Sequence, residues 1–205
     1  MRALLGWLAL GAAALAISAM RATRAPSEFV GPTMPEQSQT WQRNRAAFLS
    51  TLRYAEGTAD ANGYRALYGH TASRPKLFGN LNGHPAETGE WAGELLPAAM
   101  CAAAGFSAGC KTTAAGAYQA NLPTWIDFKR ATGASDMLPA TQDRFALWLL
   151  ERIGALAYVD AGDFDQAVSV ARSRWASLPG AGVGQPEKSL ALLRSVYQSA
   201  GGNLY

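Results

Sequence analysis

The sequence predicts a predominantly α-helical α+β domain over residues 41–205, preceded by one hydrophobic helix and a linker. Apolar residues recur at helical spacing in five segments of this domain, whereas residues 57–121 hold 10 of the 21 glycines and lack such a pattern. The chain has 205 residues, of which 49% are hydrophobic and 16% charged. This length suits one domain with a substantial core, and the composition excludes a disordered chain.

The hydrophobic helix is predicted from residues 3–20, an uncharged run between Arg2 and Arg21. Its 18 residues reach the lower limit for spanning a bilayer, but ten of them are Ala, Gly or Ser, so the segment would insert weakly. Three interpretations of residues 1–24 stay open: a signal peptide cleaved near Ser18, a permanent anchor, or a signal anchor that is later released. All three place the body outside the cytoplasm.

The linker and the first helix of the body follow in order. Three prolines and little periodicity within residues 25–40 predict a linker. From Trp41 the pattern becomes helical, with Phe48 and Leu52 on the same predicted buried face. Gly57 is a natural C-terminal stop for this helix.

The rest of the body combines a loop-rich middle with several helices. Short strands are predicted in the glycine-rich part, at 64–68 and 117–119. Helices are predicted at 123–132, 141–158, 163–175 and 186–199. A helical lobe and a loop-rich lobe would enclose a cleft suited to an extended ligand.

The charge distribution excludes nucleic acid as a partner. The formal net charge is +3, but three of the 18 basic residues, Arg2, Arg21 and Arg24, precede the first acidic residue. From residue 25 onward, 15 basic residues balance 15 acidic ones. A neutral body lacks the basic surface with which proteins neutralise phosphates.

The two cysteines, Cys101 and Cys110, lie in one Gly/Ala-rich loop. In an oxidising compartment they can form a disulfide bond, which would stabilise the fold by ~2–3 kcal/mol. Two alternatives stay open, namely free thiols or a zinc site completed by His70 and His84. The cysteine spacing is unlike that of zinc-finger ligands, so no metal is expected.

Glu56 is the candidate catalytic residue because its position disfavours a negative charge. It directly precedes Gly57 at the carboxyl end of the first helix, where the helix dipole is negative. Together with the apolar helix face nearby, this position raises the pKa of the carboxyl group. A carboxylic acid that keeps its proton near neutral pH can act as a general acid. The alternative is an ordinary surface glutamate paired with Arg53.

Several motifs resemble those of the bacteriophage lambda endolysin family (glycoside hydrolase family 104). The run Arg53-Tyr54-Ala55-Glu56-Gly57-Thr58 is similar to the segment around that family's catalytic glutamate. Later turns, Asn62-Gly63-Tyr64 and His84-Pro85, are similar as well. Residues 112–119 resemble the family's substrate-cleft segment, and residues 175–185 its C-terminal signature. Because these motifs keep their order from about residue 41 to 203, the chain is identified as a member of this family.

The resemblance implies a two-lobed, lysozyme-like fold and cleavage of the β-1,4 bond between N-acetylmuramic acid and N-acetylglucosamine in peptidoglycan. Members act as lytic transglycosylases, which leave a 1,6-anhydromuramoyl end and need one carboxyl group, here Glu56, and no cofactor. A hydrolytic muramidase would use a second acid. Asp60 is the candidate, although a turn-forming Asp is the simpler interpretation. A non-catalytic glycan-binding module is a further alternative.

Five residues are predicted to bind the glycan strand: Tyr64, Thr113, Gly116, Tyr118 and Gln119. The Tyr118 ring could stack on a sugar face, and the Gln119 amide offers both a donor and an acceptor. The small residues around Gly116 would let a glycan approach the backbone. The alternative is a plain strand with a buried tyrosine.

Three departures from the family pattern change the contacts that are expected with the substrate. Arg65 and Val183 stand where relatives carry an acidic and an aromatic residue. The loop 86–111 is longer than its counterpart. Residues 3–20 resemble the signal-arrest-release segments of other phage endolysins. We therefore expect an exported monomer that acts on peptidoglycan, held first at the periplasmic face of the inner membrane and then free in the periplasm.

Overall fold

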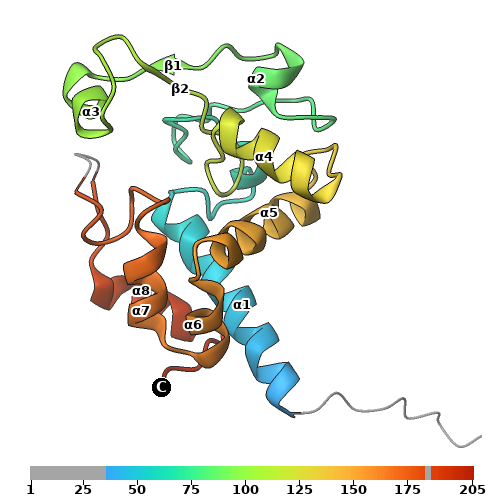
Figure 1. Cartoon of the computed structure of the whole chain (residues 1–205), viewed down its shortest axis with the longest axis vertical. Coiled ribbons are helices and arrows are strands. Elements are labelled where there is room, and N and C mark those ends of the chain that lie inside the picture. The colour runs from blue at the N-terminus through green and yellow to red at the C-terminus, as the bar shows by residue number, and fades with distance from the viewer. Residues whose placement is uncertain (1–35, 183–185) are drawn as a thin grey trace, which may run out of the picture. The chain divides into compact units, whose positions relative to one another are not determined.

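The computed structural model describes residues 36–182 and 186–205. In this part of the chain the fold is mostly helical, with two short antiparallel strands (Figure 1). The elements are α1 (Glu36–Ala55), the 3-10 helix η1 (Gly63–Arg65), α2 (Pro85–Thr88), β1 (Glu94–Leu95), α3 (Ala98–Ala103), β2 (Lys111–Thr112), α4 (Leu122–Thr132), α5 (Pro139–Arg152), α6 (Leu156–Ala161), α7 (Phe164–Ala171) and α8 (Leu190–Ser199). The predicted class, α+β with a predominance of helix, is confirmed.

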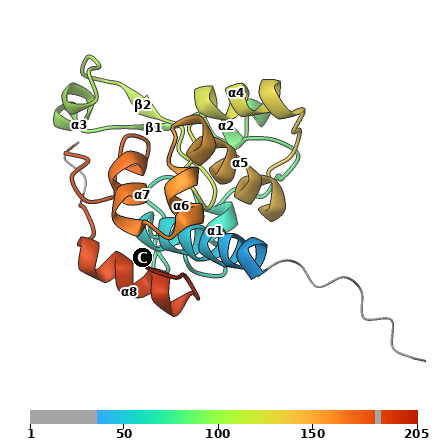
Figure 2. The same cartoon turned by 60° about the horizontal axis from the view of Figure 1, so that its bottom comes forward.

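The described elements form a helical lobe and a loop-rich lobe. In the helical lobe, α6, α7 and α8 gather along α1 (Figures 1 and 2), and α1 packs directly on α6 and α8. The loop-rich lobe contains β1, β2 and the short helices α2 and α3, and in both views the two strands lie between α3 and α2. Helices α4 and α5 pack on each other.

One hydrophobic core immobilises α1. Phe48 of α1 contacts Phe164 of α7, with ring centroids 6.0 Å apart, and Phe164 contacts Tyr197 of α8 at 4.9 Å. Trp125 of α4 and Phe145 of α5 belong to the same core, with their rings 5.4 Å apart. Buried aromatic pairs supply large apolar area and a preferred geometry. These contacts therefore fix the position of α1 in the fold, and with it the position of the helix's carboxyl end.

Most helices occur where the sequence predicts them, but several boundaries differ. Residues 36–40 belong to α1, so the predicted linker is wrong over that stretch, and residues 25–35 lie outside the described residues. The helix predicted at 163–175 ends at Ala171. The last helix begins at Leu190 rather than at residue 186, because Ser189 is its N-cap and accepts the Leu192 N–H at 3.3 Å.

The helix predicted at 141–158 is two helices, α5 and α6, separated by Gly154. Gly154 has a φ of +77° and ends α5 in a Schellman motif, in which the Ala155 N–H donates to Leu150 O at 2.8 Å. The apolar pattern continues across this break, which is why periodicity alone does not reveal it.

The strands are not where the sequence predicts them. Tyr64 lies in η1, and only Ala66 and Leu67 of the predicted strand 64–68 form isolated bridges. Residues 116–119 form a turn between Ala115 and Ala120, which bridge each other. Single bridges leave little alternating pattern to detect.

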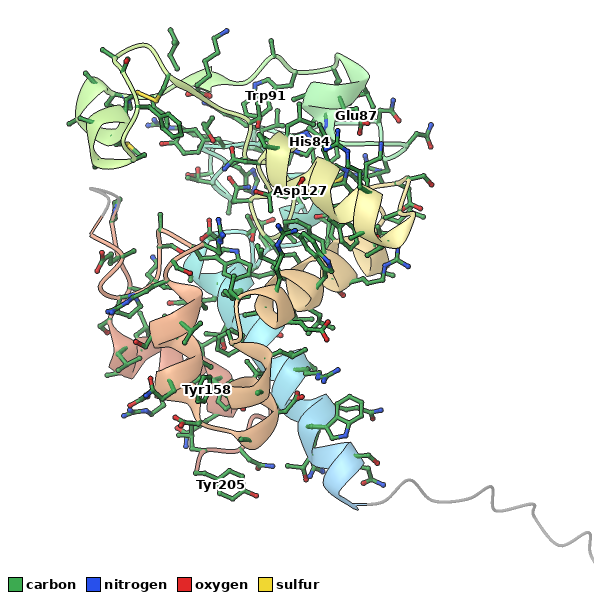
Figure 3. All side chains as sticks on the ribbon, viewed as in Figure 1. His84, Glu87, Trp91, Asp127, Tyr158 and Tyr205 are labelled. Carbon is green, nitrogen blue, oxygen red and sulfur yellow. A yellow bond between two sulfur atoms is a disulfide. The ribbon has the colours of Figure 1, made fainter. Side chains whose placement is uncertain are left out.

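The disulfide bond between Cys101 and Cys110 is confirmed. It joins α3 to the residue before β2 (Figure 3). The zinc alternative is therefore wrong, because both thiols are used. His84 is fully buried in the loop-rich lobe and contacts Ala120 O through Nε2 at 2.9 Å.

Among residues 36–182 and 186–205, no helix has the length and apolar character needed to cross a bilayer. The segment 3–20, for which the sequence predicts a membrane-entering helix, lies outside the described residues.

Candidate active site

A cleft of about 920 Å³ is lined by residues of both lobes. One wall comes from the loop-rich lobe, including His70, Thr113 and Gln119, and the other from residues 174–177 together with Pro186 and Lys188. The carboxyl end of α1 reaches the same cleft and brings Glu56 with it.

A Schellman motif places Glu56 directly after α1. The Thr58 N–H donates to Arg53 O at 2.8 Å and the Gly57 N–H donates to Tyr54 O at 3.2 Å. Gly57 has a φ of +72°, a conformation that glycine adopts without strain. The chain therefore turns sharply after Glu56, at the predicted carboxyl end of the helix.

Thr58 ties this turn to the cleft segment of the loop-rich lobe. Its hydroxyl donates to Ala117 O at 2.6 Å, and Thr58 is buried. A buried hydrogen bond between segments 59 residues apart in sequence holds the backbone of Glu56 in a fixed place relative to residues 116–120.

The Glu56 carboxyl group is poised to keep its proton near neutral pH. The residue is partly exposed at the cleft, but its carboxyl group is enclosed by surrounding protein atoms. This desolvation raises the pKa of Glu56 to about 7, against the opposing effect of a hydrogen bond donated by the Ser177 hydroxyl to Oε1 at 2.5 Å.

The alternative of a surface glutamate paired with Arg53 does not hold. The Arg53 guanidinium lies over the Tyr64 ring, with its central carbon 4.7 Å from the centroid. Arg53 takes part in no ion pair within the described residues.

Ser177 is a site residue that sequence reasoning missed. It lies 121 residues from Glu56 in the chain. Trp175, two residues before Ser177, anchors this segment, because the buried indole N–H donates to Tyr118 O at 3.1 Å. Both residues belong to the predicted C-terminal signature, which was the one sequence signal that could have identified them.

Of the five predicted glycan-binding residues, the structure brings Thr113 and Gln119 to the cleft together with Glu56. Gln119 has a φ of +47°, and its amide N–H donates to Gly116 O at 3.0 Å, so its side chain is fixed at the cleft wall. The Thr113 hydroxyl accepts the Leu122 N–H at 2.9 Å. Tyr64, Gly116 and Tyr118 do not line the cleft.

Stacking of a sugar on the Tyr118 ring does not fit this structure. Tyr118 is 3% exposed and belongs to the hydrophobic core. Its hydroxyl donates to Asp143 Oδ1 at 2.6 Å, and the Tyr64 hydroxyl donates to the same oxygen at 2.7 Å. Both hydroxyls are therefore held by Asp143, and neither tyrosine lines the cleft in which the structure places Glu56.

Gly116 serves a different purpose from the predicted one. A β-carbon at this position would lie 2.3 Å from Oε1 of the buried Gln142, so the glycine leaves room for that amide rather than for a sugar. The Gln142 amide N–H groups donate to Met137 O and Tyr64 O at 2.6 and 2.8 Å. Its Oε1 accepts the Ala117 N–H at 2.8 Å. Nothing in the sequence of α5 singled out Gln142 or Asp143.

Asp60 does not line the cleft. Its Oδ1 accepts the Asn62 N–H at 2.7 Å, which confirms the turn-forming interpretation. Its Oδ2 lies 2.9 Å from Nε2 of His70, and this hydrogen bond lowers the pKa of Asp60. The carboxylate is thus engaged by a backbone N–H and by His70, which itself lines the cleft.

A protonated carboxyl group in a cleft between a helical and a loop-rich lobe is the arrangement of a lysozyme-type glycosidase. Two solved structures agree with this class. Lysozyme from bacteriophage lambda superposes with a TM-score of 0.63 at 30% identity, and its complex with a chitohexasaccharide with a TM-score of 0.64 at 31% identity. Each match covers 80% of this chain and 97% of the other.

Sequence relatives identify the family. The endolysin of Escherichia phage P2 is 36% identical over 165 residues, covering 78% of this chain and 94% of the relative. The endolysin of Escherichia phage lambda is 32% identical over 166 residues, covering 78% and 92%. Residues 46–204 match the sequence model of the Endolysin family. The chain therefore belongs to the Endolysin family, as its motifs indicated, and has a lysozyme-like fold.

Proposed function

We propose that this protein is a phage or prophage endolysin that lyses the host cell by cleaving the β-1,4 bond between N-acetylmuramic acid and N-acetylglucosamine. Family membership and the likeness to a lysozyme with a bound chitohexasaccharide support peptidoglycan as the substrate. The observation that carries the proposal is Glu56, an acid with a pKa of about 7 that faces a long cleft.

The proposed reaction is lytic transglycosylation. Protonated Glu56 gives its proton to the glycosidic oxygen as the bond to the muramoyl C1 breaks. The resulting carboxylate takes the proton of the muramoyl 6-hydroxyl, whose oxygen bonds to C1 and closes the 1,6-anhydro ring. Glu56 is protonated again at the end, and no water is consumed. The hydrogen bond from Ser177 stabilises the carboxylate between the two steps.

The absence of a second acid in the cleft supports this reaction over hydrolysis. Glycoside hydrolases normally use two carboxyl groups, one of which activates water or attacks C1. Among the described residues, Glu56 is the one Asp or Glu that lines the cleft. Asp60, the candidate second acid, is held by His70 and by a backbone N–H.

Product analysis separates the two reactions. Mass spectrometry of peptidoglycan digested by the purified protein should show 1,6-anhydromuramoyl ends, whereas reducing ends would mean a hydrolytic muramidase. Asp60→Asn should keep most of the activity, because its carboxylate has no place in the proposed reaction. Glu56→Gln should remove it, by ~10²-fold or more. If Glu56→Gln lysed cells as well as the parent, a non-catalytic glycan-binding role would replace this proposal.

We also propose that residues 3–20 export the protein and hold it at the inner membrane until release. The weakly hydrophobic Ala/Gly-rich composition of this segment supports the proposal. Fractionation of expressing cells before and after collapse of the membrane potential should show full-length protein moving from the membrane to the periplasm. Protein that is always cleaved near Ser18, or that never leaves the membrane, would contradict release.

A further inference from the structure

The cleft carries uncompensated positive charge. Three of its lining residues are cations, Lys111, Arg174 and Lys188, whereas the one lining carboxyl group in the described part of the chain is Glu56. Since burial raises the pKa of Glu56 to about 7, roughly half of this group is ionised at pH 7, which offsets only a small part of the three positive charges. The body as a whole is neutral from residue 25 onward, so the excess is local to the cleft.

None of the three cations takes part in an ion pair within residues 36–182 and 186–205. Lys76, a lysine beside the cleft, differs from these three residues because it forms an ion pair. Its ammonium group lies beside Gly69 at the cleft wall and pairs with Glu94 at 2.8 Å. The chain thus neutralises a lysine beside the cleft and leaves the three that line it available to a ligand.

The three cations come from both lobes. Lys111 is the first residue of β2 in the loop-rich lobe. Arg174 follows α7, and Lys188 precedes α8 (Figure 1). The Lys188 ammonium lies 5.9 Å from the centroid of the Tyr54 ring, two residues from Glu56. A strand that occupies the cleft would therefore meet positive charge on both walls, close to the proposed acid.

Sugar hydroxyl and acetamido groups are neutral and gain little from such charge, whereas carboxylates gain hydrogen bonds and attraction. We infer that Lys111, Arg174 and Lys188 bind carboxylates carried by the muramoyl residues of the glycan strand. Those carboxylates belong either to the lactyl group or to the peptide attached to it. This inference rests on the proposed function, and it makes a strand with charged side groups the preferred substrate over a neutral oligosaccharide.

The test compares three ligands in a Glu56→Gln background, where no ligand is cleaved. They are soluble strands with their peptides, the same strands after an amidase has removed the peptides and freed the lactyl carboxylate, and neutral chitohexaose. The triple variant Lys111→Gln, Arg174→Gln, Lys188→Gln should bind peptide-bearing strands roughly tenfold more weakly. It should bind chitohexaose within about twofold of the parent, because that ligand offers no carboxylate.

The matched control removes equal charge elsewhere, through the triple variant Arg43→Gln, Arg130→Gln, Arg144→Gln. These arginines are exposed and do not line the cleft. The control should bind all three ligands like the parent. The defect of the cleft variant should also shrink as salt rises from low to about 0.5 M, because added ions screen exposed charges.

Each outcome has a separate meaning. A defect that persists on amidase-treated strands assigns the contact to the lactyl carboxylate, and one that disappears assigns it to the peptide. Equal weakening toward chitohexaose, or no weakening at all, overturns the inference. Cleavage by the active parent chain is measured separately, so that failure of the proposed function shows as uncleaved peptidoglycan and failure of this inference as unchanged or unselective binding.

Discussion

The raised pKa of Glu56 makes a stability prediction that is independent of any substrate. A carboxyl group whose pKa is higher in the folded than in the unfolded protein stabilises the fold while protonated, and this stability is lost as pH rises through the folded value. For Glu56 the window runs from about 4.5 to about 7. The parent protein should therefore lose stability across this range, because the carboxyl group ionises in the unfolded chain but stays protonated in the folded one.

The magnitude follows from the same two values. A pKa raised from 4.5 to about 7 corresponds to roughly 3 kcal/mol. Glu56→Gln keeps the shape of the side chain, and its amide oxygen can still accept the Ser177 hydroxyl, but it never ionises. The variant should unfold with nearly the parent's free energy at pH 4.5, and should be more stable than the parent by up to roughly 3 kcal/mol at pH 8.5.

Urea unfolding of the two proteins at both pH values, followed by tryptophan fluorescence, measures this difference. Glu151→Gln is the matched control, because it removes an exposed carboxyl group from α5, outside the cleft. That control should behave like the parent at both pH values. A Glu56→Gln variant with the same stability difference from the parent at pH 4.5 and pH 8.5 would refute the idea that Glu56 is buried at a cost and held for catalysis.

Other contacts of the site give three further expectations. Ser177→Ala removes a donor that favours the Glu56 carboxylate, so the alkaline limb of the pH–rate profile should move to higher pH. Ser177→Thr should return the limb to the parent's position. An unmoved limb in Ser177→Ala would count against a role for this hydroxyl in setting the pKa of Glu56. In denaturant unfolding, Gly116→Ala should lower the free energy of unfolding by more than ~2 kcal/mol, because strain and a steric clash combine. Gly133→Ala, which has a positive φ but open space, should lower it by only ~1 kcal/mol. Cys101→Ser should lower it by ~2–3 kcal/mol, and a reductant should have the same effect on the parent protein.

Helix ends could be predicted wherever the signal is local. Gly57 caps α1 as expected. Gly133 ends α4 in the same left-handed conformation, and the Asp163 carboxylate accepts the Gln166 N–H at 3.3 Å at the start of α7. Each of these caps depends only on residues that are close together in the sequence. Gly154 escaped prediction because the apolar pattern continues on both sides of it, and a glycine inside such a pattern does not by itself show that it has a positive φ.

In the candidate site, too, the residues that could be predicted are those whose signal lies in the adjacent sequence. Glu56 could be predicted, because its position at a helix end is a property of the adjacent sequence. The contact of Ser177 could not, since the C-terminal signature that contains this residue does not indicate that the chain returns to Glu56. Tyr118 shows the converse error: a tyrosine is equally suited to a sugar face or to a buried hydroxyl contact, and the choice was decided by Asp143, 25 residues away.

The loop 86–111, predicted to be longer than in relatives, supplies part of the cleft wall on the loop-rich side. Within residues 86–111, Met100, Phe106 and Lys111 line the cleft, and Phe106 is 64% exposed. An exposed aromatic ring on so short a segment needs a constraint to stay in one position. The disulfide between Cys101 and Cys110 supplies this constraint, because it closes the turn that contains Phe106. The loop therefore adds an apolar surface and one cation to the same face of the cleft. If the proposed substrate lies along this face, loss of the disulfide should raise KM more than it lowers kcat.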